Sequence, residues 1–118
     1  MLPFEPFLSQ AAGDPSPAVR LSVNRRDLTF NAAALRLLGE ATHVALYFDA
    51  DRRVLGVRPV EPTTEGALAL VRQPSQGRLS ARRLAREFEL QPGVLWFLTQ
   101  DGDLLAATVG PRFDAEVS

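Results

Sequence analysis

The sequence predicts an α+β domain that is mostly β, in which two ββαββ repeats form one small barrel. Three observations indicate this fold. Short stretches in which apolar and polar residues alternate are separated by turn-forming residues, as in half-buried strands. Each half of the chain holds one short helix-favouring segment. The order of these features in residues 19–59 recurs in residues 67–110, after a linker at residues 60–66.

Neither repeat has enough strands to bury the apolar face of its own sheet. Two repeats related by an approximate two-fold axis would close into one barrel without free strand edges. We therefore expect one barrel domain over residues 19–110, preceded by an irregular N-terminal arm at 1–18 and followed by a tail at 111–118. The alternative is a single α+β domain in which two unrelated βαβ-like stretches follow one another.

The first repeat begins with residues 19–23, where Val, Leu and Val alternate with Arg and Ser. A polar turn follows, and a second short strand is expected at 28–30. Two further strands are expected at 44–48 and 54–58, joined by a hairpin turn. Pro59 is expected to end this ladder, because proline has no backbone N–H to donate.

A short helix is expected in the middle of each repeat. In the first repeat it covers residues 32–38, because the side chain of Asn31 can accept from the first backbone N–H groups and Gly39 tolerates the positive φ of a helix end. Ser80 stands forty-nine residues after Asn31. It is therefore predicted to cap the second helix, at residues 81–89.

The second repeat has the same plan with different residues. Its strands are expected at residues 68–71, around Leu79, at 94–98 and at 104–105. One extra residue before the third strand changes the offset between the repeats from forty-nine to fifty. Residues 73–77 contain Pro and Gly and predict a turn. Asp101 and Gly102 lie between two apolar strands and predict a hairpin of type I′.

Composition limits the class of protein. A chain of 118 residues is expected to form one domain and to bury about two-thirds of its unfolded surface. It has no cysteine, which excludes disulfides, thiolate chemistry and zinc–sulfur sites. The net charge is −1. No apolar run is long enough to cross a membrane, and the basic region of a signal peptide is missing. A cytoplasmic protein, monomeric or homodimeric, is therefore expected.

The N-terminal arm holds four prolines but is also apolar. Three interpretations stay open for it. The arm docks on the barrel and covers an apolar patch, or it inserts into a protein partner or a second copy of the chain, or it is disordered. In the second interpretation Phe4 and Phe7 are the partner-binding residues.

An enzyme is not expected. One histidine, one tyrosine and no cysteine leave few nucleophile–base pairs. The sequence holds two Asp-x-Asp pairs, at 49–51 and 101–103, whose oxygens suit a hard cation. Both pairs fall in predicted hairpin turns, where aspartate is favoured for local hydrogen bonds. We therefore predict no catalytic residue, no metal and no cofactor.

The arginines are concentrated in the same part of both repeats. Residues 20–36 hold four arginines and one acid, and residues 72–86 hold five arginines and no acid. If the repeats are two-fold related, these segments could share one face and bind a polyanion despite the near-zero net charge. The alternative is a set of solvated arginines on outward-facing positions.

The first repeat resembles the swapped-hairpin barrel module of AbrB-type bacterial transcription regulators. The likeness rests on the helix end LRLLG at 35–39, on the strand VLGVRP at 54–59 and on LQPGV at 90–94. A tandem copy in one chain is similar to MraZ-type proteins. The chain departs from the family in lacking a proline at the helix start and a Gly-Asp pair before the third strand. It is also similar to small bacterial proteins with an F-N-x-x-A-L-x-x-L-G stretch, a likeness that implies no activity.

The family resemblance implies a DNA-binding transcription regulator that contacts DNA through arginines around the first hairpin and the helix. By position these would be Arg25, Arg26, Arg36, Arg78, Arg82 and Arg83. The sequence therefore leads to two expectations. One is a non-enzymatic barrel that binds duplex DNA through these arginines, and the other is a protein-interaction module that uses Phe4 and Phe7 of the arm.

Overall fold

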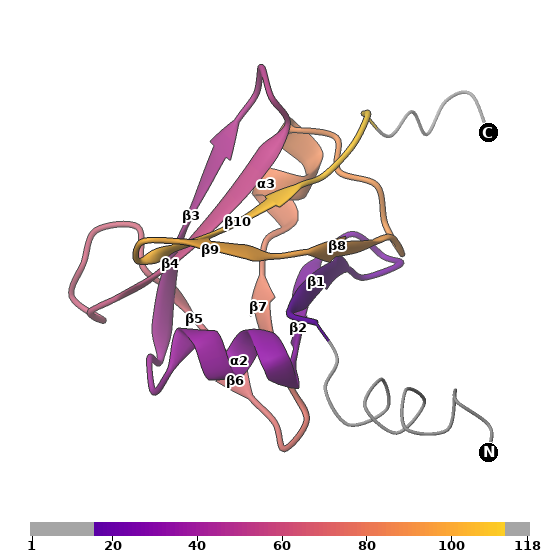
Figure 1. Cartoon of the computed structure of the whole chain (residues 1–118). Coiled ribbons are helices and arrows are strands. Elements are labelled where there is room, and N and C mark those ends of the chain that lie inside the picture. Colours follow the sequence, from indigo (N-terminus) through magenta and orange to yellow (C-terminus); the bar gives the residue numbers. More distant parts are fainter. Residues whose placement is uncertain (1–15, 113–118) are drawn as a thin grey trace, which may run out of the picture.

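The computed structural model describes residues 16–112, which form two antiparallel five-stranded sheets and two short helices (Figure 1). The mostly β, α+β class is as predicted. The elements are β1 (Ala18–Leu21), β2 (Asp27–Asn31), α2 (Ala32–Leu38), β3 (His43–Asp49), β4 (Val54–Val60), β5 (Leu68–Ala69), β6 (Val71–Arg72), β7 (Gln76–Ser80), α3 (Arg82–Glu87), β8 (Leu95–Phe97), β9 (Thr99–Asp101) and β10 (Leu104–Thr108).

The strands do not close into the predicted barrel. The first sheet has the order β6-β7-β2-β1-β8 and the second has the order β5-β3-β4-β10-β9. The chain passes from the first sheet to the second through α2, between β2 and β3. It passes between the sheets again at Leu70, between β5 and β6, and at Leu98, between β8 and β9, and both leucines are buried.

The two halves of the chain pair with each other in both sheets. Strand β2 of the first half pairs with β7 of the second, with Thr29 opposite Arg78 at the middle of the ladder. Strand β4 pairs with β10, with Gly56 opposite Ala106. These are residues that the offsets of forty-nine and fifty make equivalent. The repeat itself stays a prediction.

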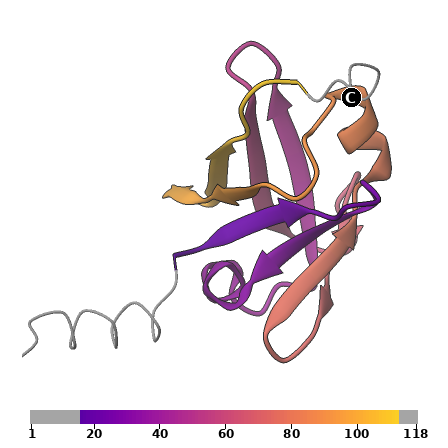
Figure 2. The same cartoon turned by 90° about the vertical axis from the view of Figure 1, so that its right-hand side faces the viewer.

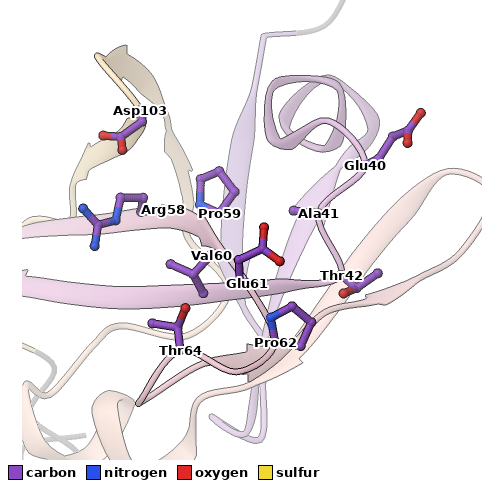
Figure 3. Close-up of a pocket in the computed structure, with 10 residues that line it drawn as sticks. All are labelled: Glu40, Ala41, Thr42, Arg58, Pro59, Val60, Glu61, Pro62, Thr64 and Asp103. Atoms are coloured by element: carbon purple, nitrogen blue, oxygen red, sulfur yellow. The ribbon is translucent and has the colours of Figure 1, made fainter.

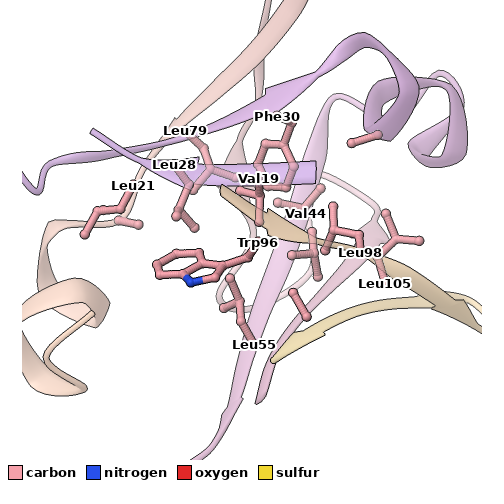
Figure 4. Packing of buried hydrophobic residues seen from close by; sticks show 14 of the residues in the cluster. Val19, Leu21, Leu28, Phe30, Val44, Leu55, Leu79, Trp96, Leu98 and Leu105 are labelled. Carbon is pink, nitrogen blue, oxygen red and sulfur yellow. The ribbon is translucent and has the colours of Figure 1, made fainter. Parts of the chain in front are cut away.

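The core lies between the sheets and takes its largest side chains from both. Phe30, Leu28 and Leu55 are fully buried, and Trp96 is 4% exposed. Figure 4 shows the Trp96 ring within this cluster, between Leu28 of the first sheet and Leu55 of the second. Among the described residues no polar or charged residue is buried, so the interior is held by apolar packing alone.

Helix α2 has the predicted bounds and the predicted cap. The Oδ1 atom of Asn31 accepts from the backbone N–H of Ala34 at 2.9 Å, and Gly39 ends the helix at φ 65°. The helix lies close to β7, because a Cβ atom on Gly77 would stand 2.6 Å from the Cδ2 atom of Leu35. Glycine at this position therefore permits the close approach of helix and strand.

Helix α3 differs from its prediction. It is shorter, at Arg82–Glu87, and its N-cap residue is Ala81, which makes no side-chain cap. The predicted cap, Ser80, is the last residue of β7 and stands opposite Asp27 in the ladder. Pairing with β2 keeps Ser80 in extended backbone as part of the strand, and the helix starts one residue later than predicted.

Two turn predictions are also corrected. Pro59 lies inside β4, opposite Val44, and the strand continues to Val60. It is tolerated because β10 pairs with β4 only as far as Val57, so the side of β4 beyond that point needs no donor. The hairpin after β9 has Gly102 and Asp103 as its loop, and only the glycine has a positive φ. This pattern is typical of type II′ and not of type I′.

Candidate nucleic-acid interface

The turn between β1 and β2 lies against the start of α3. The backbone N–H of Ala81 donates to the carbonyl of Arg26 at 2.8 Å, and Figure 2 shows the turn beside the first residues of the helix. Arg25 and Arg26 are therefore brought next to Arg82 and Arg83, from segments more than fifty residues apart in the sequence. With Arg86, one turn along α3, these five arginines are called the basic end.

Local hydrogen bonds fix the backbone of the turn that carries Arg25 and Arg26. The Ser22 hydroxyl accepts from the backbone N–H groups of Arg26, at 3.2 Å, and Asp27, at 3.1 Å. The Asn24 Oδ1 atom also accepts from Arg26 N–H, at 3.1 Å. Arg25 adopts the left-handed conformation, at φ 59°. Short polar side chains that bond nearby backbone are the usual means of holding such a turn.

Four of the five arginines of the basic end are exposed. Arg26, Arg82, Arg83 and Arg86 have exposed side chains. The three helix arginines line a surface hollow of about 620 Å³ together with Glu87. Arginine presents a planar fork of donors that matches two phosphate oxygens at once. This group of residues can therefore contact several phosphates of a nucleic-acid backbone.

Arg78 lies outside the basic end, on the outer face of the first sheet. It is exposed at the centre of β7, where its cross-strand partner is Thr29 of β2. Thr29 is in turn opposite Arg20 of β1. The outer face of the first sheet therefore holds a row in which a threonine separates two arginines. Arg20 was counted in the basic segment of the sequence but was not predicted as a site residue.

Arg36 lies farther from the basic end along the chain's first sheet, beyond the other end of β2. It lies on the exposed side of α2, which follows the end of β2 opposite to the end that carries Arg25 and Arg26. At the C-terminal end of the same helix, the Arg72 guanidinium donates to the carbonyls of Gly39, at 2.6 Å, and Ala41, at 2.9 Å. The predicted residues thus divide between two ends of the first sheet.

Arg53 has a structural role that the sequence did not reveal. Its guanidinium donates to the carbonyls of Phe88, at 2.5 Å, Glu89, at 3.3 Å, and Gly110, at 3.0 Å. Burial lowers the pKa of Arg53 and Arg112 lowers it further, while Glu89 acts in the opposite direction. No local signal marks Arg53, because its partners lie thirty-five to fifty-seven residues away.

The candidate metal ligands do not gather in the described part of the chain. Among residues 16–112 there is no cluster of three or more His, Cys, Asp or Glu side chains able to hold a metal. Asp49 accepts from the backbone of Asp51 at 3.1 Å, which is a local turn bond of the predicted kind. In the same part of the chain, no helix has the length and apolar character needed to span a bilayer.

A second hollow lies at the end of β4. It has a volume of about 490 Å³ and is lined by Glu40, Arg58, Glu61 and Asp103 among other residues (Figure 3). Figure 3 shows that these charged groups come from the end of α2, from β4 and its linker, and from the β9–β10 turn. Three of the four charges are negative, so this hollow would repel a polyanion. The basic end would attract one.

Phe4 and Phe7, the predicted partner-binding residues, lie outside the described residues. Comparison of the chain with protein-family models, with curated protein sequences and with solved structures gives no match. The chemistry of the candidate interface therefore rests on its own residues.

Proposed function

We propose that this protein is a non-enzymatic nucleic-acid-binding protein that contacts the phosphate backbone through the basic end. The observation that carries the proposal is the hydrogen bond from Ala81 N–H to the Arg26 carbonyl. It joins two arginine-rich segments that are distant in the sequence. The five arginines of the basic end therefore lie on one part of the surface. Phosphate contacts of this kind position a protein on nucleic acid.

The distribution of charge supports the proposal. Residues 20–36 hold four arginines and one acid, and residues 72–86 hold five arginines and no acid. The two segments that meet at the basic end are therefore strongly positive although the whole chain carries −1. A positive region on a nearly neutral protein is sufficient to steer a polyanion toward it.

Because of the likeness to AbrB-type and MraZ-type regulators, duplex DNA is the first ligand to test. Binding of duplex DNA would be consistent with a role in transcription regulation. The register of the central ladders supports the repeat that this likeness requires. A two-fold axis that passes between Thr29 and Arg78 and between Gly56 and Ala106 would exchange the two halves. Arg36 and Arg72 would then form a second, smaller basic group that the axis relates to the basic end.

The proposal is tested by fluorescence anisotropy of labelled duplex DNA at several salt concentrations. With about four to six phosphate contacts, the logarithm of the binding constant should fall with the logarithm of salt at a slope of about −4 to −5. R25A/R26A and R82A/R83A should each reduce both the affinity and the slope. Binding that does not change with salt, or no binding at low salt, would overturn the proposal.

The matched control is R52A/R58A. It removes the same two charges, but from the second sheet, where Arg52 lies in the β3–β4 turn and Arg58 in β4. If the basic end is the binding site, this control keeps its affinity for DNA. An equal loss in all three variants would mean that only the net charge of the protein matters.

A second candidate function is a protein-interaction module that uses the N-terminal arm. The described chain begins beside an exposed apolar strand: the Pro17 carbonyl accepts from Leu98 N–H at 2.9 Å, and Ala18 stands opposite Phe97. Phe97 is 60% exposed. An apolar surface is therefore exposed next to Pro17, near the end of the predicted arm. Association measured by analytical ultracentrifugation should be independent of salt and lost in F4A/F7A, and an unchanged sedimentation coefficient would count against this function.

A further inference from the structure

We propose that the outer face of the first sheet binds an unpaired strand of nucleic acid, with a base stacked on Phe97 and phosphates held by Arg20 and Arg78. The inference rests on the proposed function, nucleic-acid binding, and adds to the basic end a second surface that takes an unpaired strand. It is carried by the exposed residues of β8, β1 and β7, none of which belongs to the basic end.

The ladder between β1 and β8 decides which side chains face outward. Val19 is paired with Trp96, and both are buried in the core. Because side chains alternate along a strand, the next pairs on either side face the opposite way. These are Arg20 with Leu95, and Ala18 with Phe97, and of these four only Ala18 is buried, at 0% exposure. Phe97 and Arg20 are therefore diagonal neighbours on the outer face, within reach of one another's side chains.

The apolar side chains of this face are unusually exposed. Phe97 is 60% exposed and Leu95 is 50% exposed. An aromatic ring open to water at the edge of a sheet has a flat surface on which a nucleic-acid base can stack. Such stacking contributes about 1–3 kcal/mol for each base and tolerates any sequence. Sheets that bind single strands combine such aromatic residues with positive side chains that follow the backbone.

The positive side chains stand on the neighbouring strands of the same face. Arg20 is opposite Leu95 on one side and opposite Thr29 on the other, and Thr29 is opposite Arg78. Two strand spacings of about 4.8 Å separate the two arginines, or about 10 Å. Asp27 is the one carboxylate in the strands of this sheet. The row from Leu95 to Arg78 therefore passes from an apolar region to a positive one.

This combination favours an unpaired strand over a duplex. In a duplex the bases are stacked on each other, and their faces are not available to a protein side chain. A duplex could use the arginines but would leave Phe97 without a role. The same apolar residues could instead contact a second copy of the protein, and the test is designed to detect that outcome.

The test compares three labelled probes of about 15 nucleotides, a length that covers one binding site of this kind. They are oligo-dT, oligo-U and a duplex of mixed sequence, each titrated with the full chain at one salt concentration. The proposal predicts that a single strand binds more tightly than the duplex. It also predicts that F97A weakens single-strand binding about tenfold or more and leaves duplex binding unchanged. A difference in affinity between oligo-dT and oligo-U would show whether the surface prefers DNA or RNA.

The control variants separate stacking from folding and from charge. F97L keeps an apolar side chain without a ring, so it should fold normally and still bind the single strand more weakly. Y47A removes another exposed ring, which is 44% exposed on β3 of the second sheet, and it should bind all three probes normally. R20A and R78A should each weaken binding of the single strand and reduce its dependence on salt.

Three outcomes would overturn the inference. If the duplex binds at least as tightly as the single strand and F97A changes neither, the proposed function stands but the sheet face is not its site. If no probe binds, the proposed function and the inference both fail. If F97A lowers the sedimentation coefficient without changing the affinity for any probe, the exposed residues serve the association of two copies.

Discussion

The two helices occupy the same place in the two halves of the chain, yet their ends are held by different residues. Helix α2 starts at a side-chain cap, Asn31, and ends at a glycine with positive φ, Gly39. Helix α3 starts at Ala81 without a side-chain cap. Glu89, just after the helix, has a positive φ of 52° although it is not a glycine. The end of α2 is held by Arg72, and the end of α3 by Arg53.

Both helix ends receive a distant arginine, but only α2 also has local capping residues at its two ends. The residues that define α2 lie within or next to it, so its bounds follow from the sequence. Helix α3 depends on Arg53, which also bonds the Gly110 carbonyl and whose guanidinium lies 5.2 Å from the centre of the Phe48 ring. The basic end is therefore supported by a residue that does not belong to it. Four pairs of variants test this difference.

The largest effect is expected from Arg53→Ala. This variant removes charge-assisted hydrogen bonds to three carbonyls, and we expect it to lower the free energy of unfolding by about 3 kcal/mol. The matched variant is Arg72→Ala, whose hydrogen bonds are exposed, with an expected loss of about 1 kcal/mol. Urea unfolding followed by the fluorescence of the single tryptophan, Trp96, measures both. Equal losses would contradict the difference between the two helix ends.

Gly39→Ala is expected to cost about 2 kcal/mol, because the backbone at φ 65° and ψ −136° is accessible almost only to glycine. A Cβ atom at this position would meet no atom within 4 Å, so the cost is conformational and not steric. Gly77→Ala is the steric counterpart, since its Cβ would crowd Leu35 and cost about 1–3 kcal/mol. Thermal unfolding checks both, and an unchanged midpoint for Gly39→Ala would refute the backbone argument.

Asn31→Ala should lower stability by about 1–2 kcal/mol, because it removes the cap of α2. It also removes the bonds that Asn31 makes with Ala18 N–H, at 3.1 Å, and with the Ser16 carbonyl, at 2.8 Å. Ser80→Ala is the comparison, because the structure gives Ser80 no capping role, and its effect should stay within about 0.5 kcal/mol. A large loss in Ser80→Ala would restore the cap that the sequence predicted.

The smallest effect is a gain. Glu89→Gly should raise stability by about 0.5–1 kcal/mol, because glycine adopts positive φ without the strain of a side chain. Glu89 also pairs with Arg112 on the surface, an interaction that contributes little. Glu89→Ala is the control, since it loses the ion pair but keeps the strained backbone. If Glu89→Gly is less stable than Glu89→Ala, the left-handed residue carries no strain.

The sequence was sufficient where neighbouring residues determine the structure. The bounds of α2, its Asn31 cap and the hairpin between β3 and β4 were all predicted, because caps and turns depend on a few consecutive residues. The changes of sheet at Leu70 and Leu98 were not predicted, since a buried leucine in an apolar run gives no sign that the chain changes sheets. The false cap at Ser80 has the same origin, because the pairing with Asp27 overrides local preference.

The candidate interface shows the same limit. Residue counts located the two arginine-rich segments, but only the Ala81–Arg26 hydrogen bond shows that their ends meet. Arg36 was grouped with the other arginines because it is close to them in sequence, and the fold sets it at the other end of β2. Phe97 was assigned to a strand, and its outward direction depends on the register with β1.

The interlocking of the halves has a consequence for how the molecule assembles. Neither half contains a complete sheet, since β2 needs β7 and β4 needs β10. The halves therefore behave as two subunits that the exposed linker at residues 61–66 joins into one chain. A short tether of this kind gives each half an effective concentration of its partner in the millimolar range. Because the contacts that complete the sheets join distant residues, the contact order is high, and folding should be slow for a chain of this length.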